Sequence, residues 1–458
     1  MKISDWGQRS DSQRPDSQRS DLQRAGISRR SFLGLAGTAL AATALSGCAG
    51  TRFSPGGQAH QDDNTITWWS SHPGQSKPVE QELIRRFEKD HPDLTVNLID
   101  AGKNYEECAQ KFNAALTGRT VPDIVMLSDV WWFNFALNEQ ITPIEDVASE
   151  VGLDTSTYVT SLYEDYAFNG KHFALPFARS TPLFFYNKDA WKRAGLPDRG
   201  PESWDEMDEW GPRLQTDRQK GHGWGNAVDY LSWTFEGPLW TKGGAYSKEW
   251  DFTFTSDETI AAVEWLKRTV SSDGYAAISQ SLANDFSAGL YASVIASTGD
   301  LNGIVSNASF PVGTAALPNP RGTGGCPTGG AGLAIPAIIS DKRKKNAATF
   351  INYITNTANT CFWSREVGYM PVRKDASADP EMKTFLDEHP NYQTAIDQLP
   401  HTRIQDPARV FVPGADQVIG GAFESILTNN ADIRSTMKKV DKEISRAYET
   451  QIKPKMPS

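Results

Sequence analysis

A polar corner, Arg179-Ser180-Thr181, lies between two apolar runs near the middle of the chain. The runs 173–177 and 183–186 have the composition of buried strands. A guanidinium and two hydroxyl groups between buried strands either find hydrogen-bond partners or lower the stability of the fold. The corner is therefore a candidate for polar recognition.

Asp129 is a second candidate, because it follows an almost unbroken apolar run over 121–127. Such a run is typical of a strand in a parallel sheet, and these sheets bind ligands beyond the carboxyl ends of their strands. Ser70 and His72 follow the run 65–69 in the same way. The position favours a binding role for Asp129 over that of a solvated surface acid.

No catalytic motif is recognisable in the sequence. It has neither a G-x-x-x-x-G-K-[ST] phosphate loop nor a G-x-S-x-G nucleophile elbow. The seven histidines are scattered, and no H-E-x-x-H or C-x-x-C spacing indicates zinc. Acidic residues are numerous, so a pair of glycosidase carboxylates stays an open alternative, although no pair stands out. We expect no catalytic residue, no metal and no cofactor.

Alternating strand and helix patterns position these candidates. Strand-like runs over 65–69, 94–98 and 121–127 alternate with helical patterns over 78–87 and 105–116. This order predicts an α/β fold. A chain of 458 residues is long enough for two such lobes, each with its own core.

The predicted organisation has two segments outside the fold and two lobes. The ranges are 1–47 for a disordered region with an export signal, 48–63 for a tether, 64–143 with 327–356 for the first lobe, and 144–326 with 357–458 for the second lobe. The stretch 221–244 is dense in aromatic residues and glycines, which suits a wall facing a cleft.

The first 47 residues carry the pattern of an export signal. Residues 8–24 repeat a polar five-residue unit that cannot build a core. Arg29 and Arg30 then precede a mildly apolar run that ends at Leu45, the order of regions found in export signals. The paired arginines resemble a twin-arginine signal, which exports folded proteins.

Cys48 is the predicted site of lipid attachment. Leu45-Ser46-Gly47-Cys48 resembles a lipobox, in which the cysteine becomes the first residue of the mature protein. A transmembrane helix is the alternative, but the apolar run is short and is diluted by glycine, serine and threonine. We therefore expect an exported protein anchored to the outer face of the cell membrane by a lipid on Cys48.

The net charge limits the kinds of macromolecule that the protein can bind, and the cysteine content limits the number of disulfides. The net charge of −10 argues against nucleic acid or an anionic membrane surface as a partner. Cys108, Cys326 and Cys361 remain after Cys48, so at most one disulfide can form. Cys108 lies on a helical pattern and is expected to be a small buried residue.

The segment 170–196 resembles a motif of extracellular solute-binding proteins, the family that serves ATP-binding-cassette importers. The family pattern is G-K-x-x-x-x-P, a polar loop, Y-N-K-[DE], and a helix that ends in A-G-[LI]. Here it reads Gly170-Lys171, Pro176, Tyr186-Asn187-Lys188-Asp189 and Ala194-Gly195-Leu196, followed by Trp204-Asp205-Glu206. Several spacings agree together, so the match is specific.

A narrower likeness covers nearly all of the mature chain. The stretches 66–70, 104–106, 179–182, 368–371 and 406–413 are similar to the glycerol-3-phosphate-binding branch that serves Ugp importers. The actinobacterial type of this branch takes glycerophosphodiesters such as glycerophosphocholine. The resemblance implies a type II periplasmic-binding fold, in which crossover strands join two α/β lobes around a ligand cleft.

The resemblance also implies a set of ligand-binding residues. They carry over as Tyr105, Asp129, Ser180, Trp233, Ser297, Gly330, Tyr369 and Arg409, with Tyr230 as a weaker member. Arg409 can supply a bidentate pair to a phosphodiester, and Ser297 and the Gly330 amide can add donors. Asp129 and Tyr105 can accept from glycerol hydroxyls.

Aromatic residues would complete that site. Trp233 offers a flat face to the carbon skeleton, and Tyr230 can help to cage a choline ammonium group. Each assignment has a structural alternative. Arg409 could form a salt bridge, and Trp233 could be part of the core.

The preferred function is a lipid-anchored binding protein that closes about a hinge on glycerophosphocholine, another glycerophosphodiester or sn-glycerol 3-phosphate. It would then deliver the ligand to the permease subunits of the importer. A sugar- or oligosaccharide-binding protein with the same fold is the alternative, and an exported hydrolase is a third. We expect a monomer that contacts the membrane only through its lipid and binds no nucleic acid.

Overall fold

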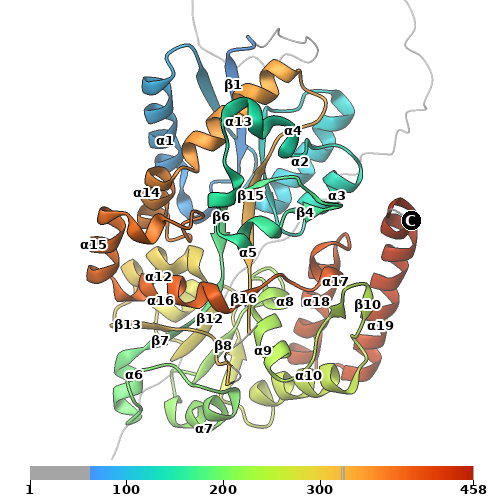
Figure 1. Ribbon diagram of the computed structural model, residues 1–458. Helices are drawn as coiled ribbons and strands as arrows, with labels where there is room; N and C mark the ends of the chain where they lie inside the picture. The colour runs from blue at the N-terminus through green and yellow to red at the C-terminus, as the bar shows by residue number, and fades with distance from the viewer. Residues whose placement is uncertain (1–61, 321, 323–324, 457–458) are drawn as a thin grey trace, which may run out of the picture. The chain divides into compact units, whose positions relative to one another are not determined.

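The computed structural model describes residues 62–320, 322 and 325–456. The predicted export signal, Cys48 and nearly all of the tether lie outside the described residues. Strands and helices alternate along the described chain and form two five-stranded sheets (Figure 1). This confirms the predicted α/β class.

The first sheet has the order β2-β1-β3-β15-β6. Its strands are β1 (Thr65–Ser70), β2 (Thr95–Asp100), β3 (Ile124–Ser128), β6 (Leu175–Ser180) and β15 (Gly329–Ala334). The strand β1 runs parallel to β2 and β3, whereas β15 is antiparallel to β3 and β6. The helices α1 (Lys77–Asp90), α2 (Tyr105–Gly118), α3 (Trp132–Leu137), α4 (Glu145–Ala148), α5 (Thr160–Glu164), α13 (Asp341–Ile354) and α14 (Thr357–Val367) accompany it.

The second sheet has the order β11-β8-β12-β7-β13. Its strands are β7 (Pro182–Asn187), β8 (His222–Trp224), β11 (Ala276–Ile278), β12 (Ser293–Ser297) and β13 (Val312–Ala315). Its helices are α6 (Lys188–Arg193), α7 (Trp204–Leu214), α8 (Leu231–Thr234), α9 (Glu236–Thr241), α10 (Asp257–Val270), α11 (Leu282–Ser287), α12 (Leu301–Asn307), α16 (Pro390–Gln398), α17 (Pro407–Val410), α18 (Ala415–Thr428) and α19 (Ile433–Ala447). The helix α15 (Pro380–Glu388) packs between α14 and α16.

Three two-stranded pairs complete the strand inventory of the described chain. They are β4 (Ala167–Phe168) with β5 (Lys171–His172), β9 (Ser247–Lys248) with β10 (Asp251–Phe252), and β14 (Cys326–Pro327) with β16 (Thr402–Arg403). The pair β14–β16 brings residues 402–403 beside the chain that leads into β15.

Local sequence signals set several of the element boundaries. The side chain of Asn187 caps α6 by accepting a hydrogen bond from the Ala190 amide, and Gly195 beyond its end has a positive φ of 64°. Ser340 caps α13 in the same way through the Arg343 amide. The helix that the motif over 170–196 places before Gly195 is confirmed.

The polar corner is where the chain first passes between the two sheets. Ser180 ends β6 in the first sheet, and Pro182 begins β7 in the second. The range predicted for the second lobe begins at residue 144, whereas β6 belongs to the first sheet. Residues 144–174 also accompany the first sheet, since α5 packs against β6 and α4 packs against α13. The division of the chain into two lobes stays a prediction.

The corner side chain Arg179 is fully buried and finds its partners within the protein. Its guanidinium is ion-paired with Asp165, and Nη1 donates to the Tyr166 hydroxyl at 2.8 Å. Burial raises the pKa of Asp165 to about 6, although the adjacent Arg179 opposes that shift. Arg179 thus forms a structural ion pair with Asp165 at the polar corner.

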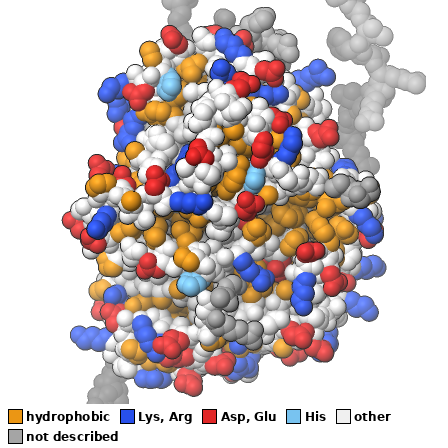
Figure 2. Space-filling model, in the orientation of Figure 1, with side chains coloured by type: hydrophobic (Ala, Val, Ile, Leu, Met, Phe, Trp, Pro, Cys, Tyr) orange, Lys and Arg blue, Asp and Glu red, His pale blue; other side chains and the backbone are white. Residues whose placement is uncertain are grey.

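Hydrophobic residues fill the space between the sheets and their helices. Cys108, Cys326 and Cys361 are buried and free, and Cys108 is fully buried as predicted. In the face shown in Figure 2, charged side chains surround a band of hydrophobic side chains at the level of α5 and α17. None of the helices in the described part of the chain is both long and apolar enough to cross a membrane.

Candidate functional site

Asp129, Gly330 and Trp233 meet where β15 begins. The Asp129 amide donates to the Gly330 carbonyl at 3.0 Å, and the indole Nε1 of Trp233 donates to the Thr328 carbonyl at 2.9 Å. Gly330 has a φ of +99°, and a Cβ at this position would overlap the Ala178 carbonyl. Only glycine therefore fits there, and the close approach brings three predicted residues to one strand end.

The same strand end explains the position of two more predicted residues. Gly329 pairs with Ser180, and a Cβ on Gly329 would overlap the ring of Trp233. The indole therefore packs against the β15 backbone and is 5% exposed. The Ser180 hydroxyl has no hydrogen-bond partner among the described residues. Trp233 thus has both a packing contact and a place beside the predicted ligand residues.

Arg409 is buried without a neutralising carboxylate. Its side chain lies at the last turn of the short helix α17 and is 3% exposed. Within the described chain no carboxylate approaches it to 4.0 Å. Its Nε donates to the Ser232 hydroxyl at 3.1 Å, and its Nη1 donates to the Gln405 side-chain carbonyl. The salt bridge considered as the alternative for Arg409 is not formed.

Two acids whose charges interact with Arg409 have raised pKa values. Burial raises the pKa of the Glu236 carboxyl well above its usual range, and the neighbouring Asp406 raises it further. Burial also raises the pKa of Asp416, against the opposing effect of Arg409. Neither carboxylate forms an ion pair with Arg409 in the described chain.

Gln405 connects this cation to the first sheet. The Gln405 amide nitrogen donates to Oδ2 of Asp129, while its carbonyl oxygen accepts from Arg409. Asp129 also accepts from the Val130 amide at 3.0 Å through Oδ1. One polar chain thus runs from Ser232 through Arg409 and Gln405 to Asp129.

Tyr105, Tyr369 and Ser297 form a second group. The hydroxyls of Tyr105 and Tyr369 are 3.1 Å apart. Tyr369 packs on Gly299, whose amide donates to the Ser297 hydroxyl at 3.0 Å. Burial raises the pKa of both tyrosines, so both hydroxyls stay protonated and can donate as well as accept.

Tyr230 combines an exposed side chain with desolvating surroundings. Its side chain is 48% exposed and its φ is 58°, a left-handed conformation that is uncommon outside glycine. Surrounding protein, followed by the charges of Asp300 and Asp129, raises the pKa of Tyr230 to about 12. Strained backbone is found at many functional sites.

Asp300 is an exposed acid beside Tyr369 and Tyr230 that the sequence did not reveal. Its side chain is exposed, yet desolvation by nearby protein raises its pKa to about 6. It follows directly after Gly299, on which Tyr369 packs, and its charge acts on both Tyr369 and Tyr230. Asp300 thus adds a carboxylate near the aromatic part of the site.

The predicted ligand residues therefore lie in two groups, one around Asp129 and Gly330 and one around Tyr369 and Gly299. The charges of Asp129 and Asp300 both act on Tyr230. Gln405, Ser232 and Asp300 belong to the same groups and were missed. Gln405 is four residues before Arg409, and Ser232 precedes Trp233, so proximity to predicted residues was the available signal.

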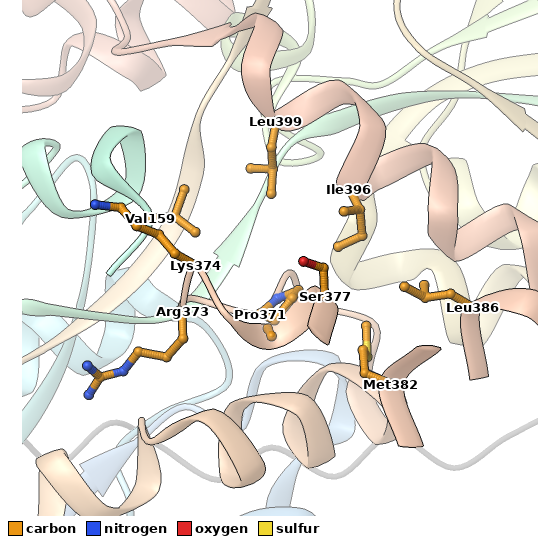
Figure 3. A pocket seen from close by; sticks show the side chains of 10 residues that line it. Val159, Pro371, Arg373, Lys374, Ser377, Met382, Leu386, Ile396 and Leu399 are labelled. Carbon is orange, nitrogen blue, oxygen red and sulfur yellow. The ribbon is translucent and has the colours of Figure 1, made fainter. Parts of the chain in front are cut away.

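A pocket elsewhere in the molecule shares none of these residues. It measures about 80 Å³ and lies beside the passage from α14 to α16, as Figure 3 shows. Leu399, Ile396 and Val159 contribute to its mostly apolar lining, and the Arg373 guanidinium points away from it (Figure 3). Arg373 instead donates through Nε to the Thr355 carbonyl at 2.6 Å. In the described residues no group of three or more His, Cys, Asp or Glu could hold a metal ion.

Comparisons with known proteins show the family of the chain. A family model described as bacterial extracellular solute-binding protein matches residues 82–394. The sn-glycerol-3-phosphate-binding periplasmic protein UgpB of Pectobacterium atrosepticum is 26% identical over 365 residues, which cover 76% of this chain and 81% of the relative.

Solved structures extend the likeness. UgpB from Mycobacterium tuberculosis, in complex with glycerophosphocholine, has a TM-score of 0.82 and 52% identity, covering 85% of this chain and 99% of that one. A Thermotoga lettingae ABC transporter solute-binding protein bound with α-D-tagatose has a TM-score of 0.72 at 19% identity, covering 84% of this chain and 99% of that one. The second likeness shows the fold alone, and the fold is that of type II periplasmic solute-binding proteins.

Proposed function

The chain belongs to the bacterial extracellular solute-binding proteins, and we propose on this premise that it captures glycerophosphodiesters such as glycerophosphocholine, or sn-glycerol 3-phosphate. It would deliver them to the permease subunits of an ATP-binding-cassette importer. The ligand class is supported by a relative that shares 52% of its residues and is in complex with glycerophosphocholine. The family consists of binding proteins and not of enzymes.

The buried guanidinium of Arg409 is the observation that carries the ligand class. A buried cation with only neutral partners is costly unless an anion compensates it. The phosphate of a glycerophosphodiester supplies that anion, and Arg409 can offer a charge-assisted hydrogen bond to it. A neutral sugar would leave this charge uncompensated.

The other site residues suit the remaining parts of such a ligand. Asp129, Tyr105 and Tyr369 can hydrogen-bond glycerol hydroxyls, and the edge or face of Trp233 can contact the carbon skeleton. Tyr230 and Asp300 offer an aromatic ring and a carboxylate, which both attract a quaternary ammonium group. The arrangement therefore favours a zwitterionic diester.

Export and anchoring belong to the same proposal. A twin-arginine signal would export the protein, and a lipid on Cys48 would hold the monomer at the outer face of the cell membrane. Cys48→Ala should shift the protein from the detergent phase to the aqueous phase in Triton X-114 partitioning, because lipid chains supply the membrane affinity. A wild-type protein that stays aqueous in a host with working lipidation would contradict the anchor.

Calorimetric titration with a ligand panel tests the proposed function. We expect binding of glycerophosphocholine or sn-glycerol 3-phosphate, and no binding of maltose at the same concentrations. Product analysis after incubation should recover intact diester, since a binding protein releases its ligand unchanged. Tight maltose binding without phosphate binding would favour the sugar-binding alternative, and diester turnover would favour a hydrolase.

A further inference from the structure

Gln405 joins the two charged members of the site, and we propose that it is a positioning residue for ligand binding. Its side-chain amide would orient the Arg409 guanidinium and the Asp129 carboxylate so that a bound phosphodiester meets both. The proposal rests on the proposed function, since it concerns the same ligand.

The hydrogen bonds of Gln405 suit this role. The side chain is 3% exposed, and its two polar ends contact two different charged groups. The amide nitrogen donates to Asp129, and the amide oxygen accepts from Arg409. Among uncharged side chains, a primary amide of this length can donate to a carboxylate and accept from a guanidinium at the same time.

The guanidinium is thereby fixed at two of its three nitrogens. Ser232 accepts from Nε, and Gln405 accepts from Nη1, which sets the plane of the fork. The Nη2 nitrogen has no hydrogen-bond partner in the part of the chain that the structure describes. Its donors are consequently free for an anion, and their direction is set by the Gln405 contact.

The backbone that carries Gln405 is also held in place. The next amide, that of Asp406, donates to Glu236 at 2.8 Å, and the Asp406 carboxylate accepts from the Tyr246 amide at 2.7 Å. Both partners of Asp406 come from the α8–α9 region and the chain after it. Gln405 therefore projects from a rigid support, as a positioning residue requires.

The absence of charge on the Gln405 side chain is as important for the proposed role as the length of that side chain. A carboxylate at this position would compensate the charge of Arg409 before a ligand arrives, and it would repel Asp129. A protonated carboxyl could again donate to Asp129 and accept from Arg409. The pH dependence of ligand affinity in a variant with a titratable side chain at this position therefore distinguishes a positioning role from a purely structural role.

The test compares Gln405→Met and Gln405→Glu with wild type by titration with glycerophosphocholine. Removal of hydrogen bonds to two charged groups should weaken Gln405→Met by at least about tenfold at neutral pH. Gln405→Glu should lose more, and part of its loss relative to wild type should be recovered near about pH 5, where a glutamic acid begins to protonate. Gln393→Met is the matched control, because Gln393 also donates to an aspartate, Asp397, but at the exposed surface of α16. Its affinity should equal that of wild type.

The outcomes separate this inference from the proposed function. Wild-type protein that binds neither glycerophosphocholine nor sn-glycerol 3-phosphate would overturn the proposed function. Wild-type binding with unchanged affinity in Gln405→Met would overturn the positioning role alone. Equal losses in both variants, with lowered melting temperatures and no recovery at acid pH, would show that Gln405 only supports the fold.

Discussion

The guanidinium of Arg409 is held by two neutral side chains. Removal of the Arg409 side chain should therefore lower the affinity for phosphate ligands more than it lowers the stability of the fold. A hydrogen bond to a charged group contributes about 1.5 to 3 kcal/mol, which corresponds to at least about tenfold in affinity. Arg409→Ala should therefore weaken glycerophosphocholine binding at least tenfold in calorimetric titration. Arg409→Lys should recover only part of this loss, because an ammonium group cannot reproduce the planar fork.

Arg434 offers a matched control for this prediction, since its side chain is 65% exposed. Arg434→Ala should keep wild-type affinity. Unchanged affinity of Arg409→Ala together with a lowered melting temperature would make Arg409 a structural residue and remove the support for a phosphate ligand.

His222 is a buried titratable residue outside the ligand groups. Its side chain is 1% exposed, Nδ1 lies 2.9 Å from the Ser293 hydroxyl, and Nε2 has no hydrogen-bond partner in the described structure. Burial lowers its pKa to about 3. Below pH 6.5, the pKa of histidine in the unfolded chain, the unfolded chain binds a proton at His222 that the folded protein does not bind. This stabilising contribution is therefore complete above pH 6.5 and is lost as the pH falls towards 3.

His222→Gln should consequently flatten the acid side of the stability profile. The pKa difference corresponds to about 5 kcal/mol in the free energy of unfolding across this pH range. Urea denaturation at a series of pH values measures the slope, and His401→Gln serves as the exposed control. Equal slopes for His222→Gln and wild type would contradict the assignment.

Individual side chains differed in how readily the sequence revealed them. Asp129 could be found because it ends a continuous apolar strand, which places it at the edge where such sheets bind ligands. Arg409 and Trp233 needed the resemblance to known binding proteins. Gln405 carries no pattern of its own, because its role depends on Asp129, a residue far away in the sequence.

The strand β15 shows why one central element escaped prediction. Its sequence, GGAGLA, lacks the β-branched and aromatic residues that indicate strands. The glycines are required by contacts that a sequence pattern does not display. Gly330 passes close to the Ala178 carbonyl, and Gly332 lies against the ring of Tyr166. In contrast, β1, β2 and β3 with α1 and α2 follow the predicted βαβαβ order.

Gly330→Ala should destabilise the pairing of β15 with β6. A positive φ costs an alanine about 1 to 2 kcal/mol, and overpacking against a backbone carbonyl adds about 1 to 3 kcal/mol. The free energy of unfolding without ligand should therefore fall by at least about 2 kcal/mol.

Gly421→Ala provides the matched control within α18. An added Cβ at Gly421 meets nothing within 4 Å, and this glycine has no positive φ. The control should keep or slightly raise stability, because alanine is the better helix former. If Gly330→Ala has wild-type stability in urea denaturation, the close approach of Gly330 to the Ala178 carbonyl does not require glycine.

Several contacts connect elements of the first sheet with elements of the second. Gln405 bonds Asp129, the rings of Phe133 and Phe411 stack with centroids 4.3 Å apart, and Trp132 lies edge-on to Phe411. Phe133 and Trp132 belong to α3, whereas Phe411 follows α17. The chain passes between the sheets several times, at Thr181 and again between β13 and β15. Such connections suit two lobes that open and close about a hinge.

Closure predicts that contacts away from the ligand also set affinity. Phe411→Ala removes the stacked pair with Phe133, and aromatic pairs contribute about 0.5 to 1.5 kcal/mol. Because this contact would stabilise the closed state for every ligand, glycerophosphocholine and sn-glycerol 3-phosphate should weaken by the same factor of about 2 to 10. Arg409→Ala is the comparison for Phe411→Ala, because it removes a contact with the phosphate of the ligand and not a contact within the protein.

Solution scattering checks the motion itself. A ligand that contacts both lobes favours the closed state by its differential contacts, so a saturating diester should reduce the radius of gyration of wild type. Phe411→Ala should have a larger radius than wild type without ligand and should still contract when ligand is added. An identical radius with and without a bound diester would refute closure and would require that the site be fully formed before the ligand arrives.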